Sequence, residues 1–345
     1  MQQVSIPTLK DVIHHVAVRQ RNPLFIWGAS GIGKTDAVEQ VCADQGGVLC
    51  DIRLSQYESV DFRGLPDITP GEQVTKWLLP SMMPFKGNPA FVDNGKPIFL
   101  FLDEINQGQP SVLSTCYQLL NEGRVGEHEL LDNVVMVAAG NRDEDKGTTN
   151  RWPKPLGNRG THVEATTSVD GWVQWAGKAG KPAELLGFMQ FRPELIHTHD
   201  PKSADKVFAS PRTWSMAGDY LADSEMPDYI KWISIAGSVG DGPGAELNAF
   251  IGLMADLPNI RAVLADPNGV PIPHESDKQW AAATMISGYM KNNDNLRKLQ
   301  VYLSRLEAEM VPVAWTTAIA RDDSIIESDT FIYDYSPRYR ALFSR

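Results

Sequence analysis

One octapeptide, GASGIGKT, constrains this 345-residue chain more than any other feature. It matches G-x-x-x-x-G-K-[ST], in which glycines let the backbone wrap around phosphate groups at the start of a helix. An apolar run at 24–27 precedes it and an amphipathic stretch at 34–45 follows it, as such a loop requires. A glycine turn that precedes a lysine by chance would match in about one chain in a hundred of this length. The predicted phosphate-binding residues are Gly28, Ala29, Ser30, Gly31, Ile32, Gly33, Lys34 and Thr35.

A second motif supplies the acids that a phosphate-binding loop needs. The apolar run 97–102 ends in two adjacent carboxylates, Asp103 and Glu104. Lys34 can reach the outer phosphates of a nucleotide, whereas Thr35 and Asp103 suit the coordination of magnesium. Glu104 is placed to orient and polarise an attacking water. The pattern predicts ATP and Mg²⁺ as cofactors; the alternative is that both acids are merely solvated at a strand end.

The first half of the chain alternates short apolar runs with helical stretches. This alternation is typical of an α/β fold, here a P-loop NTPase core with a central parallel sheet flanked by helices. We expect a nucleotide-binding domain over 1–168, with an insertion at about 63–96 and a hairpin at 123–131. The apolar spacing then becomes helical, which predicts a mostly helical lid and C-terminal domain over 169–345. The expected strands are 24–27, 48–54, 97–102, 134–139 and 161–165, and the expected helices include 9–20, 34–45 and 110–121.

The charge and cysteine content exclude several classes of partner. Asp and Glu number 43 against 32 Lys and Arg, a net charge of -11, and no basic run interrupts this balance. Such a field repels phosphate backbones, which argues against nucleic acid as a partner. Three scattered cysteines provide neither a disulfide framework nor a zinc site, so we expect a reducing, cytoplasmic location. We expect neither a signal peptide nor a membrane span, because no apolar run approaches the ~20 residues that cross a bilayer.

Five segments together resemble the MoxR branch of AAA+ ATPases (dynein-related), and within it the CbbQ/NorQ type. They are GASGIGKT, FLFLDEINQ, QLLNEGRVGEHELLDN, VMVAAGN and PLGNR, and the resemblance covers about residues 10–216. The first motif and the LDE acids are shared by many ATPases, whereas the DEIN sequence and the hairpin are more specific to this branch. The resemblance implies ATP hydrolysis in a homo-oligomeric, hexameric ring.

The same resemblance implies roles for three further residues. Asn141 matches the sensor-1 residue that helps to place water near the γ-phosphate, although a turn asparagine is the plain alternative. Arg159 matches the arginine finger that is offered to the neighbouring subunit's ATP. The family usually has phenylalanine where this chain has Gly160, so Arg151 is a second candidate for the finger. Arg212 matches sensor 2, acting in its own subunit or in the next; the alternative is a surface arginine that caps a helix.

The resemblance also favours one biological role over two others. Relatives of this type remodel a partner protein, commonly a client or adaptor with a von Willebrand factor A domain. A nucleic-acid motor or loader with the same core is the main alternative, and a nucleotide-gated binding module that hydrolyses poorly is a third. Some residues of the insertion either grip a substrate or pack the insertion onto the core: Trp77, Met82, Met83 and Phe85.

Overall fold

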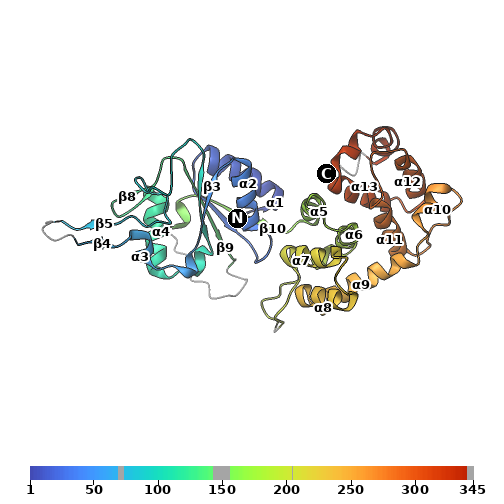
Figure 1. Cartoon of the computed structure of the whole chain (residues 1–345), viewed down its shortest axis with the longest axis horizontal. Coiled ribbons are helices and arrows are strands. Elements are labelled where there is room, and N and C mark those ends of the chain that lie inside the picture. Colours follow the sequence, from blue (N-terminus) through green and yellow to red (C-terminus); the bar gives the residue numbers. More distant parts are fainter. Residues whose placement is uncertain (69–73, 143–155, 204, 340–345) are drawn as a thin grey trace. The chain divides into compact units, whose positions relative to one another are not determined.

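The computed structural model describes residues 1–68, 74–142, 156–203 and 205–339. It divides into two compact units (Figure 1). The first unit comprises Met1–Thr166 with Asp200–Lys202, and the second comprises Thr167–His199 with Ser203–Arg345. The first unit is built on a six-stranded sheet, and the second is helical.

The large sheet of the first unit is parallel at every strand pair that the described residues form. Its strand order is β1-β10-β2-β9-β6-β3, so β9 lies between the strand that precedes the glycine loop and the strand that ends in Asp103. This architecture confirms the predicted α/β fold class, a central parallel sheet flanked by helices and followed by a mostly helical part. The strands are β1 Gln2–Ser5, β2 Leu24–Trp27, β3 Val48–Arg53, β6 Ile98–Asp103, β9 Val134–Gly140 and β10 Thr161–Thr166.

Helices cover both faces of this sheet (Figure 1). Successive side chains of a strand point to opposite faces. Leu24 and Ile26 of β2 therefore pack in one core with the first helices, whereas Phe25 and Trp27 pack in the other core with α4. Burial on both faces explains why β6 reads as an almost continuous apolar run. The covering helices are α1 Ile6–Val12, a π-helix Ile13–Arg19 and α2 Lys34–Asp44 on one face, and α3 Ser59–Arg63 and α4 Pro110–Glu122 on the other.

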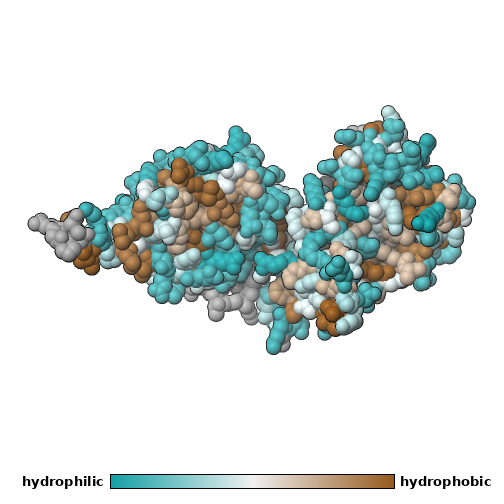
Figure 2. Space-filling model, in the orientation of Figure 1, coloured by the Kyte–Doolittle hydropathy of each residue, from teal (hydrophilic) through white to brown (hydrophobic). Residues whose placement is uncertain are grey.

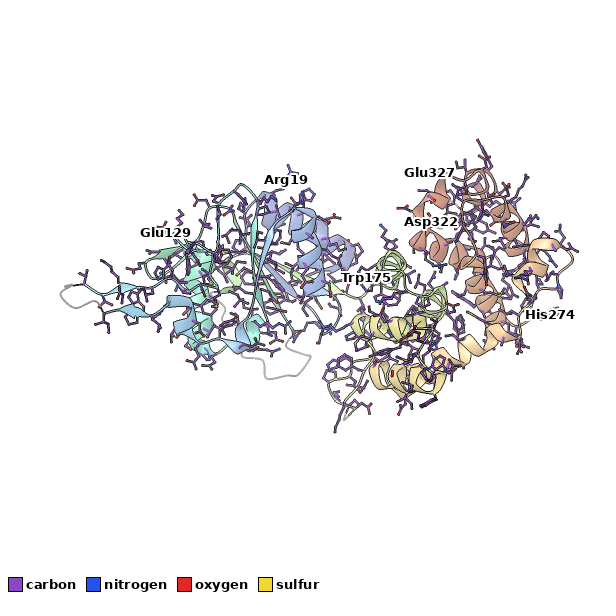
Figure 3. The ribbon with its side chains drawn as sticks, in the orientation of Figure 1. Arg19, Glu129, Trp175, His274, Asp322 and Glu327 are labelled. Atoms are coloured by element: carbon purple, nitrogen blue, oxygen red, sulfur yellow. The ribbon has the colours of Figure 1, made fainter. Side chains whose placement is uncertain are left out.

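The insertion and the short hairpin pack against each other. The strands are β4 Pro66–Asp67 and β5 Lys76–Trp77 in the insertion, and β7 Arg124–Val125 and β8 His128–Glu129 in the hairpin. Glu129, labelled in Figure 3, pairs with Lys86 of the insertion at 3.4 Å. Met83 and Phe85 are completely buried, so for these two the packing alternative is correct. Large apolar side chains are nonetheless exposed around β4 and β5, where Figure 2 shows hydrophobic surface: Leu65, Ile68, Val74, Trp77 and Leu78.

The second unit contains helices and no strand in its described residues. Two apolar cores hold it together, one around Phe188 and Trp214 and the other around Trp315 and Tyr335. In the part of the chain that the structure describes, no helix has both the length and the apolar character to cross a membrane. The helices are α5 Val169–Lys178, α6 Ala183–Phe191, α7 Pro211–Ala222, α8 Asp228–Val239, α9 Asp241–Ala255, α10 Ile260–Ala265, α11 Ser276–Ser287, α12 Asn295–Leu303, α13 Met310–Arg321 and α14 Ser336–Tyr339.

Candidate nucleotide-binding site

The glycine loop connects β2 to the N-terminus of α2. Gly33 is the N-cap of α2 and has φ 99°, a left-handed conformation that side-chain-bearing residues rarely adopt. Because Gly33 has no side chain, it caps none of the first N–H groups of α2, and these groups suit an external anion. Ile32 is buried in the core between the sheet and α2, and this packing anchors the loop to the core.

Lys34 lies inside this loop and links it to the end of β9. Its ammonium donates hydrogen bonds to the carbonyl oxygens of Gly28 and Ala29, both at 2.8 Å. It also donates to the Asn141 side-chain oxygen at 3.2 Å. Only 8% of Lys34 is exposed, and a buried ammonium needs such acceptors because it loses hydration. The structure therefore brings two of the predicted site residues, Lys34 and Asn141, into direct contact.

Thr35 and Asp103 form a second contact of the same site. The Thr35 hydroxyl donates to an Asp103 carboxylate oxygen at 3.1 Å, while the other Asp103 oxygen accepts the Glu104 backbone N–H at 2.8 Å. Burial and the neighbouring negative charge of Asp103 raise the pKa of the Asp51 carboxyl on β3. A hydroxyl and a carboxylate in contact are oxygen ligands of the kind that magnesium takes together with phosphate oxygens and water. The donor set fits Mg²⁺.

Glu104 is held by its backbone and by a hydroxyl. It has φ 53°, a left-handed conformation that costs a residue with a side chain about 1–2 kcal/mol. Ser55 lies in the short 3₁₀ helix Leu54–Gln56 that follows β3. Its hydroxyl donates to the Glu104 carboxylate at 2.6 Å. Strained backbone of this kind persists only where its surroundings enforce it, and it concentrates at functional sites.

Arg159 contacts an aromatic side chain of α4. Its guanidinium donates to the Tyr117 hydroxyl at 2.7 Å and lies 5.3 Å from the centre of that ring. Gly160 follows, and a Cβ atom there would lie 2.3 Å from the Pro23 carbonyl oxygen. The chain thus approaches β2 too closely for the phenylalanine that the resembled family has at this position. The other finger candidate, Arg151, lies outside the described residues.

Arg212 belongs to the second unit. It is exposed in the first turn of α7, whose N-cap is Ser210. The Ser210 hydroxyl accepts the Thr213 backbone N–H at 3.3 Å, so the capping role that was the alternative for Arg212 is taken by Ser210. The contribution of Arg212 to a nucleotide site stays a prediction.

Three side chains that contact the predicted site residues were not themselves predicted to belong to the site: Ser55, Asn106 and Tyr117. Ser55 follows a predicted strand, and the carboxyl ends of parallel strands collect functional side chains, so its position was a usable sign. Asn106 lies inside the DEIN segment, next to the acids. Tyr117 sits within a helix, and nothing in its spacing distinguishes it from the other residues of that helix.

Several solved structures are similar to this chain. No family model and no curated protein matches the sequence. The RuvB Holliday junction branch migration motor of Thermotoga maritima is similar over 75% of this chain and 74% of its own, with 13% identity and a TM-score of 0.39. A putative ATPase from Cytophaga hutchinsonii is similar over 93% and 84%, with 12% identity and a TM-score of 0.35. Hsp104, in a closed state with ATPγS and FITC casein, is similar over 68% and 44%, with 16% identity and a TM-score of 0.36.

Proposed function

We propose that this protein is a magnesium-dependent ATPase that works as a subunit of a homo-oligomeric, hexameric ring of the MoxR type. One observation carries the ATPase proposal. Residues from three separate motifs meet at the carboxyl ends of neighbouring strands, where Lys34 contacts Asn141 and Thr35 contacts Asp103. Accidental matches to three motifs have no reason to converge on one edge of a sheet, whereas a phosphate-binding site requires it.

Each residue of the site has a chemical task in this proposal. Lys34 and the N–H groups at the start of α2 bind the phosphates, and Thr35 and Asp103 hold the magnesium ion. When bound, Mg²⁺ offsets the negative charge of the phosphates. Glu104 accepts a proton from the attacking water, and Asn141 orients that water.

Loss of Lys34 is expected to weaken nucleotide binding. Lys34→Ala removes the only charged donor of the loop 28–35 and with it charge-assisted hydrogen bonds of about 1.5–3 kcal/mol, or about 10- to 150-fold in Kd. Isothermal titration with a non-hydrolysable ATP analogue and Mg²⁺ measures this change. The matched control is Lys86→Ala, a half-exposed lysine whose surface pairs lie outside the loop. Equal affinities of Lys34→Ala and wild type would contradict the role of Lys34.

The work of the ring is remodelling of a partner protein in the cytoplasm. The partner is a client or adaptor with a von Willebrand factor A domain, as the resemblance implies. The exposed apolar side chains around β4 and β5 support a protein rather than a nucleic-acid partner, because apolar surface contributes little to binding phosphate backbones. The three cysteines are buried free thiols, which suits a reducing compartment.

Nucleic acid is expected neither to bind tightly nor to stimulate turnover. Because the protein has a net charge of -11, it should bind duplex DNA at physiological salt with a Kd no better than the ~10⁻⁴–10⁻⁶ M of non-specific contacts. The measurement is the rate of phosphate release from MgATP, alone and with DNA or RNA, together with fluorescence anisotropy of labelled DNA. Sub-micromolar affinity with steep salt dependence, and stimulation by DNA, would favour the nucleic-acid motor. Absence of turnover under every condition would favour a binding module.

A further inference from the structure

Asn106 is a buried side-chain amide next to the proposed catalytic residues. It has no solvent exposure and lies in the short turn Ile105–Gln107 that follows Glu104. Its amide nitrogen donates to the Asn141 carbonyl oxygen at 2.8 Å, and its amide oxygen accepts the Asn141 backbone N–H at 3.3 Å. Burying an amide is costly unless its donors and acceptors are satisfied. Here the backbone of Asn141 satisfies both ends of the amide, since its carbonyl oxygen accepts from the amide nitrogen and its N–H donates to the amide oxygen.

These two bonds continue the sheet where its backbone pairing stops. The register of β6 and β9 ends at Leu102 and Ala138, and Asn141 lies one residue beyond β9. Asn106 therefore takes the place of a strand neighbour for Asn141. Gly140 makes this possible, because a Cβ atom there would lie 3.0 Å from the Asn106 oxygen and 2.7 Å from the Trp27 ring. A side chain at position 140 would push the amide away.

The same turn also determines the conformation of Glu104. The Gln107 N–H donates to the Glu104 carbonyl oxygen at 2.8 Å, which closes the turn while Glu104 has φ 53°. Asn106 is the middle residue of this turn, so its two hydrogen bonds to the Asn141 backbone also fix the position of the turn. One side chain thus connects the backbone of the proposed general base with the backbone of the residue that contacts Lys34.

We propose that Asn106 is a positioning residue that holds Glu104 and Asn141 in a fixed mutual geometry for ATP hydrolysis. It touches neither nucleotide nor magnesium and acts only through these two residues. The inference rests on the proposed ATPase function. Its loss changes the rate of the chemical step rather than nucleotide binding, because Lys34, Thr35 and the loop N–H groups keep their own contacts.

Two variants of Asn106 test this role. Asn106→Leu has a similar size but forms no hydrogen bonds, and its kcat is expected to fall at least about tenfold with nearly unchanged Kd for a non-hydrolysable ATP analogue. Asn106→Asp keeps an acceptor for the Asn141 N–H but lacks the donor to its carbonyl, and it is expected to lose part of that rate. If Asn106→Leu does not fold, Asn106→Asp decides with the same readouts.

Asn133→Leu is the matched control for a buried amide. Asn133 is also buried, donates one hydrogen bond to the Lys96 carbonyl at 2.7 Å, and lies just before β9, at the end of that strand opposite to Asn141. This variant is expected to lower Tm but to keep kcat when assayed well below its Tm. A loss of kcat in Asn133→Leu equal to that in Asn106→Leu would overturn the inference, because the effect would then follow from general destabilisation.

A mutant cycle separates positioning from an independent contribution. If Asn106 acts only through the side chains of Glu104 and Asn141, adding Asn106→Leu to the double variant Glu104→Gln/Asn141→Ala changes its turnover by no more than about twofold. A further tenfold loss of turnover in that triple variant would overturn the inference, as would an Asn106→Leu variant with the wild-type rate. A wild-type protein without magnesium-dependent turnover overturns the ATPase function and this inference together. A hydrolysing wild type with an unaffected Asn106→Leu variant overturns the inference alone.

Discussion

ATP turnover by the Glu104→Gln variant is expected to fall by a factor of about 10²–10⁴, the usual contribution of a general base. Glutamine has the size of glutamate and still accepts the hydrogen bond that Ser55 donates, but it does not take a proton from water. Nucleotide binding should stay close to the wild type, because Lys34, Thr35 and Asp103 are untouched. The variant should therefore retain ATP. Steady-state phosphate release at saturating MgATP and retention of labelled ATP after gel filtration measure the two effects.

Glu129→Gln is the matched control for this change. It makes the same substitution on β8, where Glu129 is mostly exposed and pairs with Lys86 at the surface. A surface pair of this kind contributes about 0–1 kcal/mol to stability, so the control should keep wild-type turnover. Magnesium-dependent turnover at the wild-type rate in Glu104→Gln would remove Glu104 from the catalytic role.

The central strands of the sheet could be predicted because they are mostly buried on both faces. The run 24–27 coincides with β2, and the runs predicted at 134–139 and 161–165 end one residue short of β9 and β10. Buried parallel strands are nearly continuous apolar runs, which stand out in a sequence. The spatial order of the strands could not be predicted in this way, because it depends on crossover connections that leave no local signal in the sequence.

Two elements show where local patterns mislead. β1 has one buried residue, Val4, and so carries no apolar run, yet it pairs with β10 at the edge of the sheet. The Asp-Gly-Pro-Gly sequence at 241–244 suggests a loop between helices but forms the first turn of α9. Pro243 is tolerated there because the first N–H groups of a helix have no partner within it.

The candidate site was predictable to the extent that its chemistry is local. The loop 28–35 and the acids at 103–104 are contiguous motifs, so their roles follow from residue types and spacing. The partners of these residues are not local. Ser55 reaches Glu104 across 49 positions and Arg159 reaches Tyr117 across 42, and the local pattern of a single sequence does not indicate such pairs.

Arg159→Ala is expected to leave ATP binding nearly intact and to lower hydrolysis by about 10³-fold or more, the usual cost of losing an arginine finger. The structure offers a physical reason why Arg159 suits this task. Within the described residues its guanidinium is held by the neutral Tyr117 and forms no ion pair, so its positive charge is oriented without being neutralised. A guanidinium also contacts two oxygens at once, which a lysine does not, so Arg159→Lys should restore only part of the rate.

Mixed rings test whether Arg159 acts on the neighbouring subunit. Arg159→Ala subunits are expected to bind ATP but to lack the finger, whereas Lys34→Ala subunits are expected to keep the finger but to bind ATP weakly. Each variant alone should be nearly inactive. In a mixture, an interface between an intact loop on one subunit and an intact Arg159 on the next regains turnover, and the rate should depend on the mixing ratio. Subunit exchange is verified first by fluorescence transfer between labelled subunits.

The control for this experiment is Arg297→Ala in the second unit. Arg297 is largely exposed and lies 3.7 Å from Asp334, so its loss removes one arginine charge without touching the first unit. Arg297→Ala subunits keep both the loop 28–35 and Arg159 and should turn over ATP like the wild type. Their mixtures with Lys34→Ala subunits should show only the turnover of the Arg297→Ala fraction. If Arg159→Ala and Lys34→Ala subunits exchange freely and never regain turnover, Arg159 acts within its own subunit or is not the finger. In that case Arg151→Ala replaces Arg159→Ala in the same mixing experiment, because Arg151 is the second candidate for a finger that completes the neighbouring subunit's site.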